Sequence, residues 1–241
     1  MGEKRPQLRV LVNELARRHP QLADPGRLIA SGHVLVDGIV STNPATLVRS
    51  DASISLRHEK RLRGETKLEA ALRQFVVPTA GRVAVDVGAA AGGFTRRLLL
   101  AGVARVYAVD VGHGQLLGSL RRDPRVVVLE RTNLADLDTD LVPDALGVVT
   151  LDLSYLAVAR AVPQLERLRV ERDADLVALI KPIFELGLAE PPTDRRQHDL
   201  AVARAVRGIE ADRWRVVETM PSPVRGARGA MEFFLHARRR E

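Results

Sequence analysis

Lysine is rare in this chain, and that rarity draws attention to Lys181. Of the 37 basic residues only four are lysine, and Lys181 directly follows the apolar run LVALI, residues 176–180. Arginine keeps its proton in proteins, whereas a lysine can act as a base if burial or a neighbouring cation lowers its pKa. Lys181 is therefore a candidate general base for a weakly acidic group such as a hydroxyl.

Three other residues are expected at the same edge of a predicted sheet. Asp152 ends one predicted strand (VVTLDLS), and Glu232 begins another (MEFFLHA). Lys67 lies on a predicted helix ahead of the sheet. Ligands of open α/β sheets bind beyond the carboxyl ends of the parallel strands, so these side chains can converge there. Each lysine would favour the neutral form of the other, and the carboxylates would hold them. The alternative for Lys181 is a strand-end lysine that only reaches solvent.

A glycine-rich loop, DVGAAAGGF at residues 86–94, predicts a cofactor site. Gly88 suits a tight turn, and Gly92 lets a ligand approach the backbone closely. Asp110 ends the next predicted strand, where an acid can accept hydrogen bonds from ribose hydroxyls. The loop lacks the G-x-G-x-x-G spacing of nicotinamide dinucleotide sites, and its acidic start at Asp86 suits the cationic S-adenosylmethionine. We therefore expect S-adenosylmethionine, with a nicotinamide dinucleotide as the alternative.

Strands alternating with helices must position these residues from residue 81 onward. Strands are predicted at 82–87, 104–110, 125–130, 146–152, 175–180, 214–220 and 231–237, and helices at 93–101, 114–121, 156–169 and 195–211. This alternation indicates a mainly parallel, doubly wound α/β sheet. Only PSPVRGARGA separates the last two strands, so the last strand is predicted to be antiparallel.

The first part of the chain has a different pattern. Helices are predicted at 7–18 and in ADPGRLIASG, where Asp24 can cap the helix, followed by a hairpin turning at Asp37-Gly38 and a strand at 53–56. Residues 58–66 are polar and basic, as in a linker, and 67–77 are predicted to be helical. The expected organisation is a small α+β domain over 1–57, a linker and helix over 58–80, and an α/β domain over 81–241.

Charge and composition restrict the partners. The formal net charge is +7 and the pI is near 10.6, which favours nucleic acid first and an anionic membrane surface second. The absence of cysteine excludes disulfides and zinc–thiolate sites, and no metal is expected. No apolar run is long enough to span a membrane, and the first residues hold no signal-peptide core, so the expected compartment is the cytoplasm. The candidate phosphate-binding residues are Arg5, Arg9, Arg17, Arg18, Arg27, Arg225 and Arg228.

Several stretches resemble the TlyA-type (hemolysin A) family, a branch of the FtsJ-like ribose methyltransferases. The matching stretches are RGETKLEAAL, DVGAAAGGFT, VDVGHGQL, RRDPRVVVLERTN, LDLSY, IKPIFELG and MEFF. The resemblance implies an RNA-binding domain of the ribosomal protein S-four type, followed by a Rossmann-like domain with a mostly parallel seven-stranded sheet. It also implies 2′-O-methylation of ribosomal RNA or ribosomal subunits with S-adenosylmethionine.

The resemblance also assigns roles to residues. Its Lys-Asp-Lys-Glu catalytic tetrad falls on Lys67, Asp152, Lys181 and Glu232. Its cofactor contacts fall on Asp86, Gly88, Gly92, Phe94, Asp110, Asn133 and Asp152. The alternatives are an RNA-binding or ribosome-assembly factor that has lost turnover, a nicotinamide-dependent oxidoreductase and a haemolysin-like activity.

Overall fold

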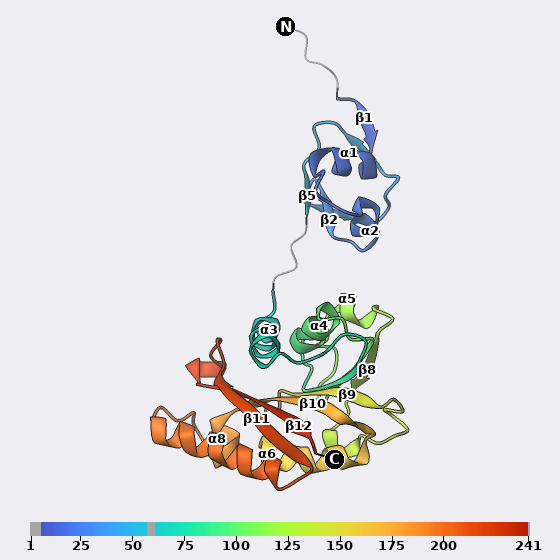
Figure 1. Cartoon of the computed structure of the whole chain (residues 1–241). Coiled ribbons are helices and arrows are strands. Elements are labelled where there is room, and N and C mark those ends of the chain that lie inside the picture. The colour runs from blue at the N-terminus through green and yellow to red at the C-terminus, as the bar shows by residue number, and fades with distance from the viewer. Residues whose placement is uncertain (1–5, 57–60, 241) are drawn as a thin grey trace. The chain divides into compact units, whose positions relative to one another are not determined.

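The computed structural model describes residues 6–56 and 61–240, which form two compact units, Met1–Lys60 and Arg61–Glu241 (Figure 1). The first unit contains β1 (Leu8–Val10), α1 (Leu11–Arg18), α2 (Pro25–Ala30), β2 (Val34–Val36), β3 (Ile39–Ser41), β4 (Leu47–Arg49) and β5 (Ile54–Leu56). Strands β3, β2 and β5 form one antiparallel sheet, and β1 pairs with β4. Leu11, Leu15 and Ile29 are at the centre of its small core.

Local signals explain the elements of this unit. The Asp24 side chain accepts a hydrogen bond from the Arg27 amide at 2.9 Å and caps α2, as predicted. The hairpin between β2 and β3 turns at Asp37 and Gly38, both with positive φ, as a tight hairpin turn requires. The predicted helix at 7–18 begins only at Leu11. Leu8 is 65% exposed, and the residues before Leu11 pair with β4 instead of joining the helix.

The second unit is an α/β domain. It contains α3 (Arg63–Phe75), β6 (Val83–Val87), α4 (Gly93–Leu100), β7 (Arg105–Asp110), α5 (Gly118–Arg121), β8 (Val126–Glu130), β9 (Leu146–Leu151), α6 (Val158–Ala161), β10 (Val170–Ile180), α7 (Pro182–Leu186), α8 (Arg195–Glu210), β11 (Trp214–Pro221) and β12 (Phe233–Arg239). Three 3₁₀ helices, Leu134–Asp136, Val162–Arg167 and Ala227–Gly229, complete it. Among the described residues, no helix is long and apolar enough to cross a membrane.

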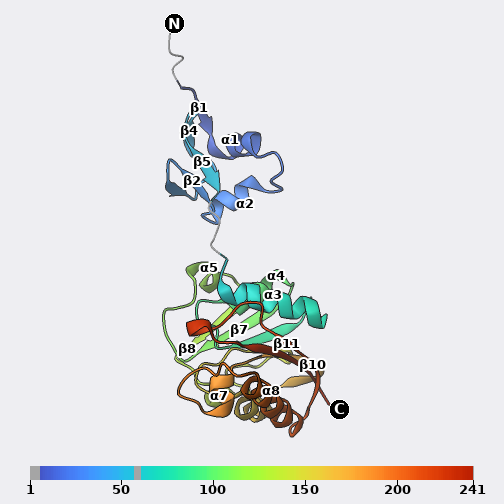
Figure 2. The same cartoon turned by 90° about the vertical axis from the view of Figure 1, so that its left-hand side faces the viewer.

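The sheet has seven strands in the order β11-β12-β10-β9-β6-β7-β8. The strands from β6 to β10 are parallel, and β12 runs antiparallel between β10 and β11, which confirms the predicted sheet. Helices α3, α4 and α5 cover one face, while α6 and α8 cover the other (Figures 1 and 2).

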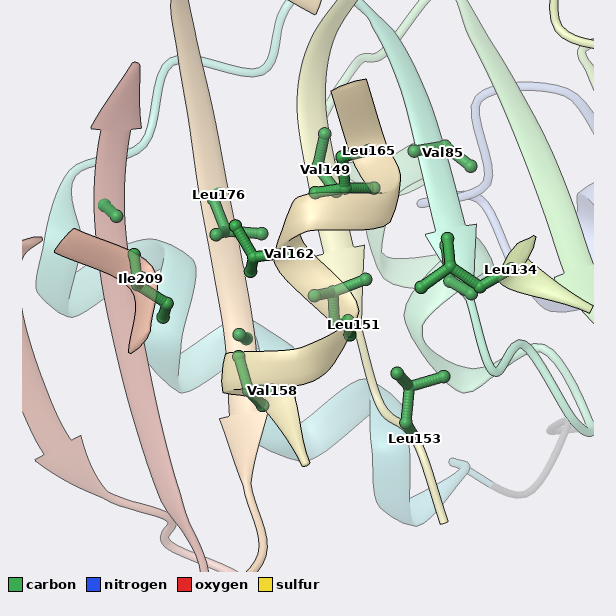
Figure 3. Close-up of a cluster of buried hydrophobic side chains, with 14 of the residues drawn as sticks. Val85, Leu134, Val149, Leu151, Leu153, Val158, Val162, Leu165, Leu176 and Ile209 are labelled. Atoms are coloured by element: carbon green, nitrogen blue, oxygen red, sulfur yellow. The ribbon is translucent and has the colours of Figure 1, made fainter. Parts of the chain in front are cut away.

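Alternation along the central strands supplies a core on each face. In β10, Leu176 and Ile180 join the cluster under α6 and α8, whereas Val177 and Leu179 join the cluster under α3 and α4. Figure 3 shows the first cluster, in which Val158 of α6 packs toward the strands. Because both faces are covered, the central strands are continuous apolar runs, and polar side chains collect at their ends.

Several helices of this unit differ from the sequence prediction. The helix predicted at 114–121 begins at Gly118, and the one predicted at 156–169 is α-helical only over Val158–Ala161 and continues as the 3₁₀ helix Val162–Arg167. Helix α3 begins at Arg63 instead of residue 67, so half of the predicted linker is helical. The reason is a close contact: Gly64 packs against Gly93 at the start of α4 and draws this segment onto the domain. The short helix α7 was not predicted, because it is one turn long and starts at Pro182.

Candidate active site

The carboxyl ends of the parallel strands meet at one edge of the sheet, and antiparallel β12 begins there. Ile180, the last residue of β10, lies opposite Phe233, the first residue of β12. Lys181 and Glu232 are the residues just beyond this pair and are therefore neighbours across the two strands. Asp152 directly follows β9, which pairs with β10 on its other side.

Lys67 and Glu232 form a buried ion pair. The Nζ of Lys67 donates to Oε2 of Glu232 at 2.5 Å, and the two side chains are 10% and 6% exposed. Loss of either partner would leave the other as an uncompensated buried charge, which is strongly destabilising. The pair therefore ties α3 to the start of β12.

Lys181 has two polar partners. Its Nζ lies 2.6 Å from Oδ1 of Asp152 and donates to Oγ of Ser154 at 2.9 Å. Lys181 is the N-cap residue of α7, so its backbone is fixed where β10 leads into that helix. Ser154 was not predicted as a site residue, although it stands two positions after Asp152 in LDLSY.

Close packing of two glycines sets the position of Lys67. A Cβ on Gly93 would lie 2.9 Å from the Cα of Gly64, so a side chain there would push α3 away. One residue further, Glu65 accepts a hydrogen bond from Nε of Arg96 at 2.7 Å. These contacts hold the first turn of α3 against α4 and aim Lys67 at the edge of the sheet.

Glu232 is held by a glycine as well. A Cβ on Gly226 would lie 2.1 Å from Oε1 of Glu232, while the backbone of Gly226 is bonded to Ala230 at 2.8 Å. Because φ of Gly226 is −73°, its need for glycine is one of space and not of backbone conformation. The loop before β12 therefore leaves room for the carboxylate.

Two cavities meet at these residues. The larger, about 570 Å³, contains all four residues of the predicted tetrad and the side of α3 at Arg63 and Gly64. The smaller, about 270 Å³, lies over β6 and β7. Both cavities are lined by Asp152, Ser154 and Lys181. The two cavities are therefore adjacent at these three residues, and groups bound in them would meet there.

The smaller cavity has the features predicted for the cofactor loop. A Cβ on Gly88 would lie 2.3 Å from the carbonyl oxygen of Asp152, so only glycine fits, and its φ of 89° also favours glycine. The carboxylate of Asp110 lines the cavity and accepts bonds from the amides of Ala90 and Gly112 at 2.8 and 2.7 Å. Each oxygen keeps a second acceptor site for a ribose hydroxyl, so the cavity fits a nucleoside such as that of S-adenosylmethionine.

Four predicted cofactor residues are not among those that line this cavity: Asp86, Gly92, Phe94 and Asn133. Asp86 is fully buried, and its oxygens accept bonds from Thr95 at 2.6 Å and Thr150 at 2.9 Å. Burial raises the pKa of Asp86 to about 6, which the two hydroxyls only partly offset. Gly92 faces leucine side chains of the α5 segment, and Phe94 stacks on Phe234 in the core. In this structure Asp86, Gly92 and Phe94 shape the loop from within, and their contact with the cofactor stays a prediction.

Asn133 lies beside the cavity. Its Oδ1 accepts bonds from the Ala135 amide at 3.2 Å and from the hydroxyl of Tyr155 at 3.1 Å, and Tyr155 lines the cavity. Thr132 and Leu134, on either side of Asn133, also line it. The position predicted by the family resemblance is therefore adjacent to the ligand space, whereas Tyr155 was missed because an isolated tyrosine carries no spacing signal.

Glu130 orders the loop that closes this cavity. Its Oε1 accepts a bond from the Gly114 amide at 3.0 Å, and its carboxylate pairs with Arg121. These bonds, led by Arg121, lower the pKa of Glu130 to about 2. The loop between β7 and α5 carries Gln115, which lines the cavity. Glu130 does not line the cavity itself, but it positions the loop that does.

Glu185 supports the wall shared by the two cavities from behind. It is buried on α7, and its Oε1 accepts a bond from the Val158 amide at 2.6 Å at the start of α6. Burial raises the pKa of Glu185 to about 7, and backbone bonds only partly offset this. Residues 152–157 connect β9 to α6 and include Asp152 and Ser154. By binding the first amide of α6, Glu185 holds the end of this connection.

The arginines of the first unit have mixed roles. Buried Glu14 accepts bonds from Arg9, Arg17 and Arg18. Arg17 and Arg9 remain 59% and 40% exposed. Arg18 also donates to the carbonyl oxygens of Ala52 and Ser50 at 2.8 and 3.0 Å, so its guanidinium is used by the fold. The binding of phosphate by Arg18 stays a prediction.

The other predicted arginines are exposed or not described. Arg27 is exposed on α2. Arg225 and Arg228 are exposed on the loop before β12, and Arg225 donates to the carbonyl of Gly229 at 3.1 Å. Arg5 lies outside the described residues.

The sheet order, the glycine turn and the two joined cavities define an S-adenosylmethionine-dependent methyltransferase of Rossmann-like fold. The chain belongs to the FtsJ-like methyltransferase family, whose model matches residues 60–239. Family membership confirms the predicted enzyme class and methyl donor, and it sets aside the nicotinamide alternative.

Relatives extend the match to most of the chain. It is 40% identical to the 16S/23S rRNA (cytidine-2′-O)-methyltransferase TlyA of Mycobacterium tuberculosis, over 93% of this chain and 85% of that protein. It is 30% identical to Hemolysin A of Brachyspira hyodysenteriae, over 87% of this chain and 90% of that one. A solved structure described as a hemolysin from Streptococcus thermophilus is similar over 99% of this chain and 90% of that one, with a TM-score of 0.69 and 26% identity.

Replacing Gly226 by alanine should displace Glu232 and disrupt its pair with Lys67. We expect the free energy of unfolding to fall by about 2–4 kcal/mol, because overpacking is combined with a buried ion pair forced apart. Denaturant unfolding measures this loss. Gly26→Ala is the control, since an added Cβ there meets ordinary contacts at 3.5 Å or more. Equal stability of Gly226→Ala and the unmodified protein would contradict the contact.

Replacing Glu185 by glutamine should change how stability depends on pH. The folded pKa of about 7 exceeds the ordinary 4.5, so the stabilising contribution of the neutral carboxyl is complete below pH 4.5 and is lost as the pH rises through 7. Relative to Glu185→Gln, the unmodified protein should lose about 3 kcal/mol between pH 4.5 and 8.5. Unfolding across this range tests it, with Glu210→Gln at the exposed end of α8 as control. Parallel stability curves for the two proteins would refute the assignment.

Proposed function

We propose that this chain transfers a methyl group from S-adenosylmethionine to a ribose 2′-hydroxyl of ribosomal RNA. The observation that carries the proposal is the wall formed by Asp152, Ser154 and Lys181 between the two cavities. It places a lysine amine where a hydroxyl in the larger cavity would face a methyl donor in the smaller one. The 40% identical relative from M. tuberculosis is named as a ribosomal RNA cytidine-2′-O-methyltransferase, which supports this substrate. Such a role would be carried out in the cytoplasm, where ribosomes are assembled.

Lys181 is the group proposed to take the proton of the hydroxyl. S-adenosylmethionine supplies an electrophilic methyl group when bound, and the hydroxyl oxygen must lose its proton as it attacks. A neutral Lys181 amine can accept that proton, because its lone pair is then available. Asp152 and Ser154 fix the amine at 2.6 and 2.9 Å, so it need not be reoriented during the reaction.

The Lys67–Glu232 pair has a second role in the same cavity. The ammonium of Lys67 stabilises the negative charge that develops on the hydroxyl oxygen, and Glu232 holds the ammonium in place. Because both groups are buried, this interaction is weakly screened by solvent. Arg63 lines the cavity beside them and adds positive charge near an RNA backbone.

The first unit is proposed to bind RNA, in the manner of a ribosomal protein S-four-type domain. The arginines that remain exposed there are Arg9, Arg17 and Arg27. Glu14 fixes the guanidinium groups of two of them, which reduces the entropy lost when they bind phosphate. Both cavities are lined by residues of the second unit, so the chemistry is proposed to take place there.

Mapping ribose methylation tests the function directly. Purified protein with S-adenosylmethionine and unmodified ribosomal subunits should methylate the 2′-oxygen of a small number of nucleotides. RNA from cells that lack the protein should be unmethylated at the same nucleotides. RNA binding without any methylation would instead indicate a ribosome-assembly factor that has lost turnover.

Replacing Lys181 by arginine should abolish most methyl transfer while the charge is retained. A guanidinium stabilises an alkoxide but cannot take its proton, so we expect single-turnover rates to fall by about 10²–10⁴. The affinity for S-adenosylmethionine, measured by calorimetry, should change little, and it serves as the control for folding. A near-normal single-turnover rate would show that Lys181 acts only through its charge.

Removing residues 1–60 should weaken RNA binding and leave cofactor binding intact. The full chain should lose RNA affinity steeply as salt rises, because arginine–phosphate contacts release counterions, and the truncated chain should show a shallower dependence. Fluorescence anisotropy with ribosomal RNA fragments measures the first property, and calorimetry the second. Equal RNA affinity and equal salt dependence would remove the first unit from the RNA-binding surface.

A further inference from the structure

A third cavity extends the substrate cavity on the side away from the cofactor. It measures about 410 Å³ and lies between the segment before α8 and the loop before β12. Its wall is shared with the substrate cavity through Pro191, Pro192, Arg228, Ala230 and Met231. Among the described residues, none lines both this cavity and the cofactor cavity. The cofactor cavity, the substrate cavity and the third cavity are therefore adjacent to one another in that order.

Specific contacts hold the wall between the second and third cavities in place. Buried His198 on α8 donates from Nε2 to the carbonyl of Pro192 at 2.9 Å, and its ring packs on Phe233 at 5.8 Å. Proline also limits the backbone of this wall. Across the opening, Arg228 adopts φ of 52° next to Gly229, a conformation that costs energy in a residue other than glycine.

The chemistry of the cavity suits a nucleotide. Arg225 and Arg228 both line it, and within the described part of the chain neither forms an ion pair with an acid, so both can bind an anion. Prolines 191 and 192, with Met231, offer an apolar surface against which a base can lie. Glu190 also lines the cavity. Its negative charge repels a phosphate, so a phosphate is expected beside the two arginines instead.

We propose that this third cavity binds the nucleotide next to the methylated one, and that Arg225 contacts the phosphodiester joining the two. The inference rests on the proposed function, because it assumes that RNA fills the substrate cavity. As far as the structure describes the chain, the third cavity shares five lining residues with the substrate cavity and none with the cofactor cavity, so an RNA chain that continues beyond the substrate cavity would enter it. Arg225 is informative because its side chain lines the third cavity and not the substrate cavity.

The test uses full-length protein and a synthetic ribosomal RNA hairpin that carries the target nucleotide. Arg225→Gln should raise KM for the hairpin about tenfold, as for one charged hydrogen bond, and lower the salt slope of binding by about one. The kcat and the affinity for S-adenosylmethionine should stay near normal. Arg225→Lys should restore part of the affinity. Arg215→Gln, which removes one exposed arginine from β11, is the control and should change neither KM nor the salt slope.

A second arm identifies the contact. A neutral methylphosphonate placed at one of the two linkages flanking the target should abolish the difference between the unmodified protein and Arg225→Gln. The proposal is wrong if the unmodified protein and Arg225→Gln still differ in KM when each of the two linkages is neutralised in turn. It is also wrong if Arg225→Gln has the same KM and salt slope as Arg215→Gln. Binding of the same hairpins, read by anisotropy, gives the same comparison without turnover. Absence of methylation by the unmodified protein would therefore overturn the proposed function while the third cavity is still judged by binding.

Discussion

The buried ion pair between Lys67 and Glu232 is the interaction on which the active site depends. Its two partners come from a helix ahead of the sheet and from the last strand, and neither charge is stable there alone. The pair can form only because glycines lie at both supports: Gly64 against Gly93 under the helix, and Gly226 against the carboxylate. The antiparallel direction of β12 is equally necessary, because a parallel last strand would begin at the opposite edge.

A second constraint joins the cofactor cavity to the substrate cavity. Gly88 approaches the carbonyl of Asp152 so closely that no side chain fits between them. The turn after β6 and the end of β9 are thus one structural unit, and Asp152 carries the carboxylate that holds Lys181. Glu130 and Glu185 act one layer further out, each fixing a segment of the cavity walls through backbone amides.

Sequence reasoning succeeded where a residue's position in the topology determines its place. The end of β10, the start of β12 and the turn at Gly88 followed from alternating strands and helices, so Asp152, Lys181 and Glu232 could be placed at one edge of the sheet from the sequence. It did not give the direction in which individual side chains point. Asp86 points into the sheet toward Thr95, and Arg18 turns toward Glu14 and two carbonyls. At the end of a loop or helix, no periodic pattern in the sequence tells whether a side chain points inward or outward. One-turn helices such as α7 are too short to show a periodic pattern at all.

The Lys67–Glu232 pair also has a consequence for folding. Its partners are 165 residues apart in the sequence, so the arrangement proposed to be catalytic forms only after most of the domain has been ordered. Contacts of such separation form late and slow the folding reaction. An intermediate that lacks β12 would hold Lys67 without its carboxylate, and it would be both less stable and inactive. The appearance of activity during refolding should therefore coincide with docking of the last strand and not with collapse of the α4–β7 region.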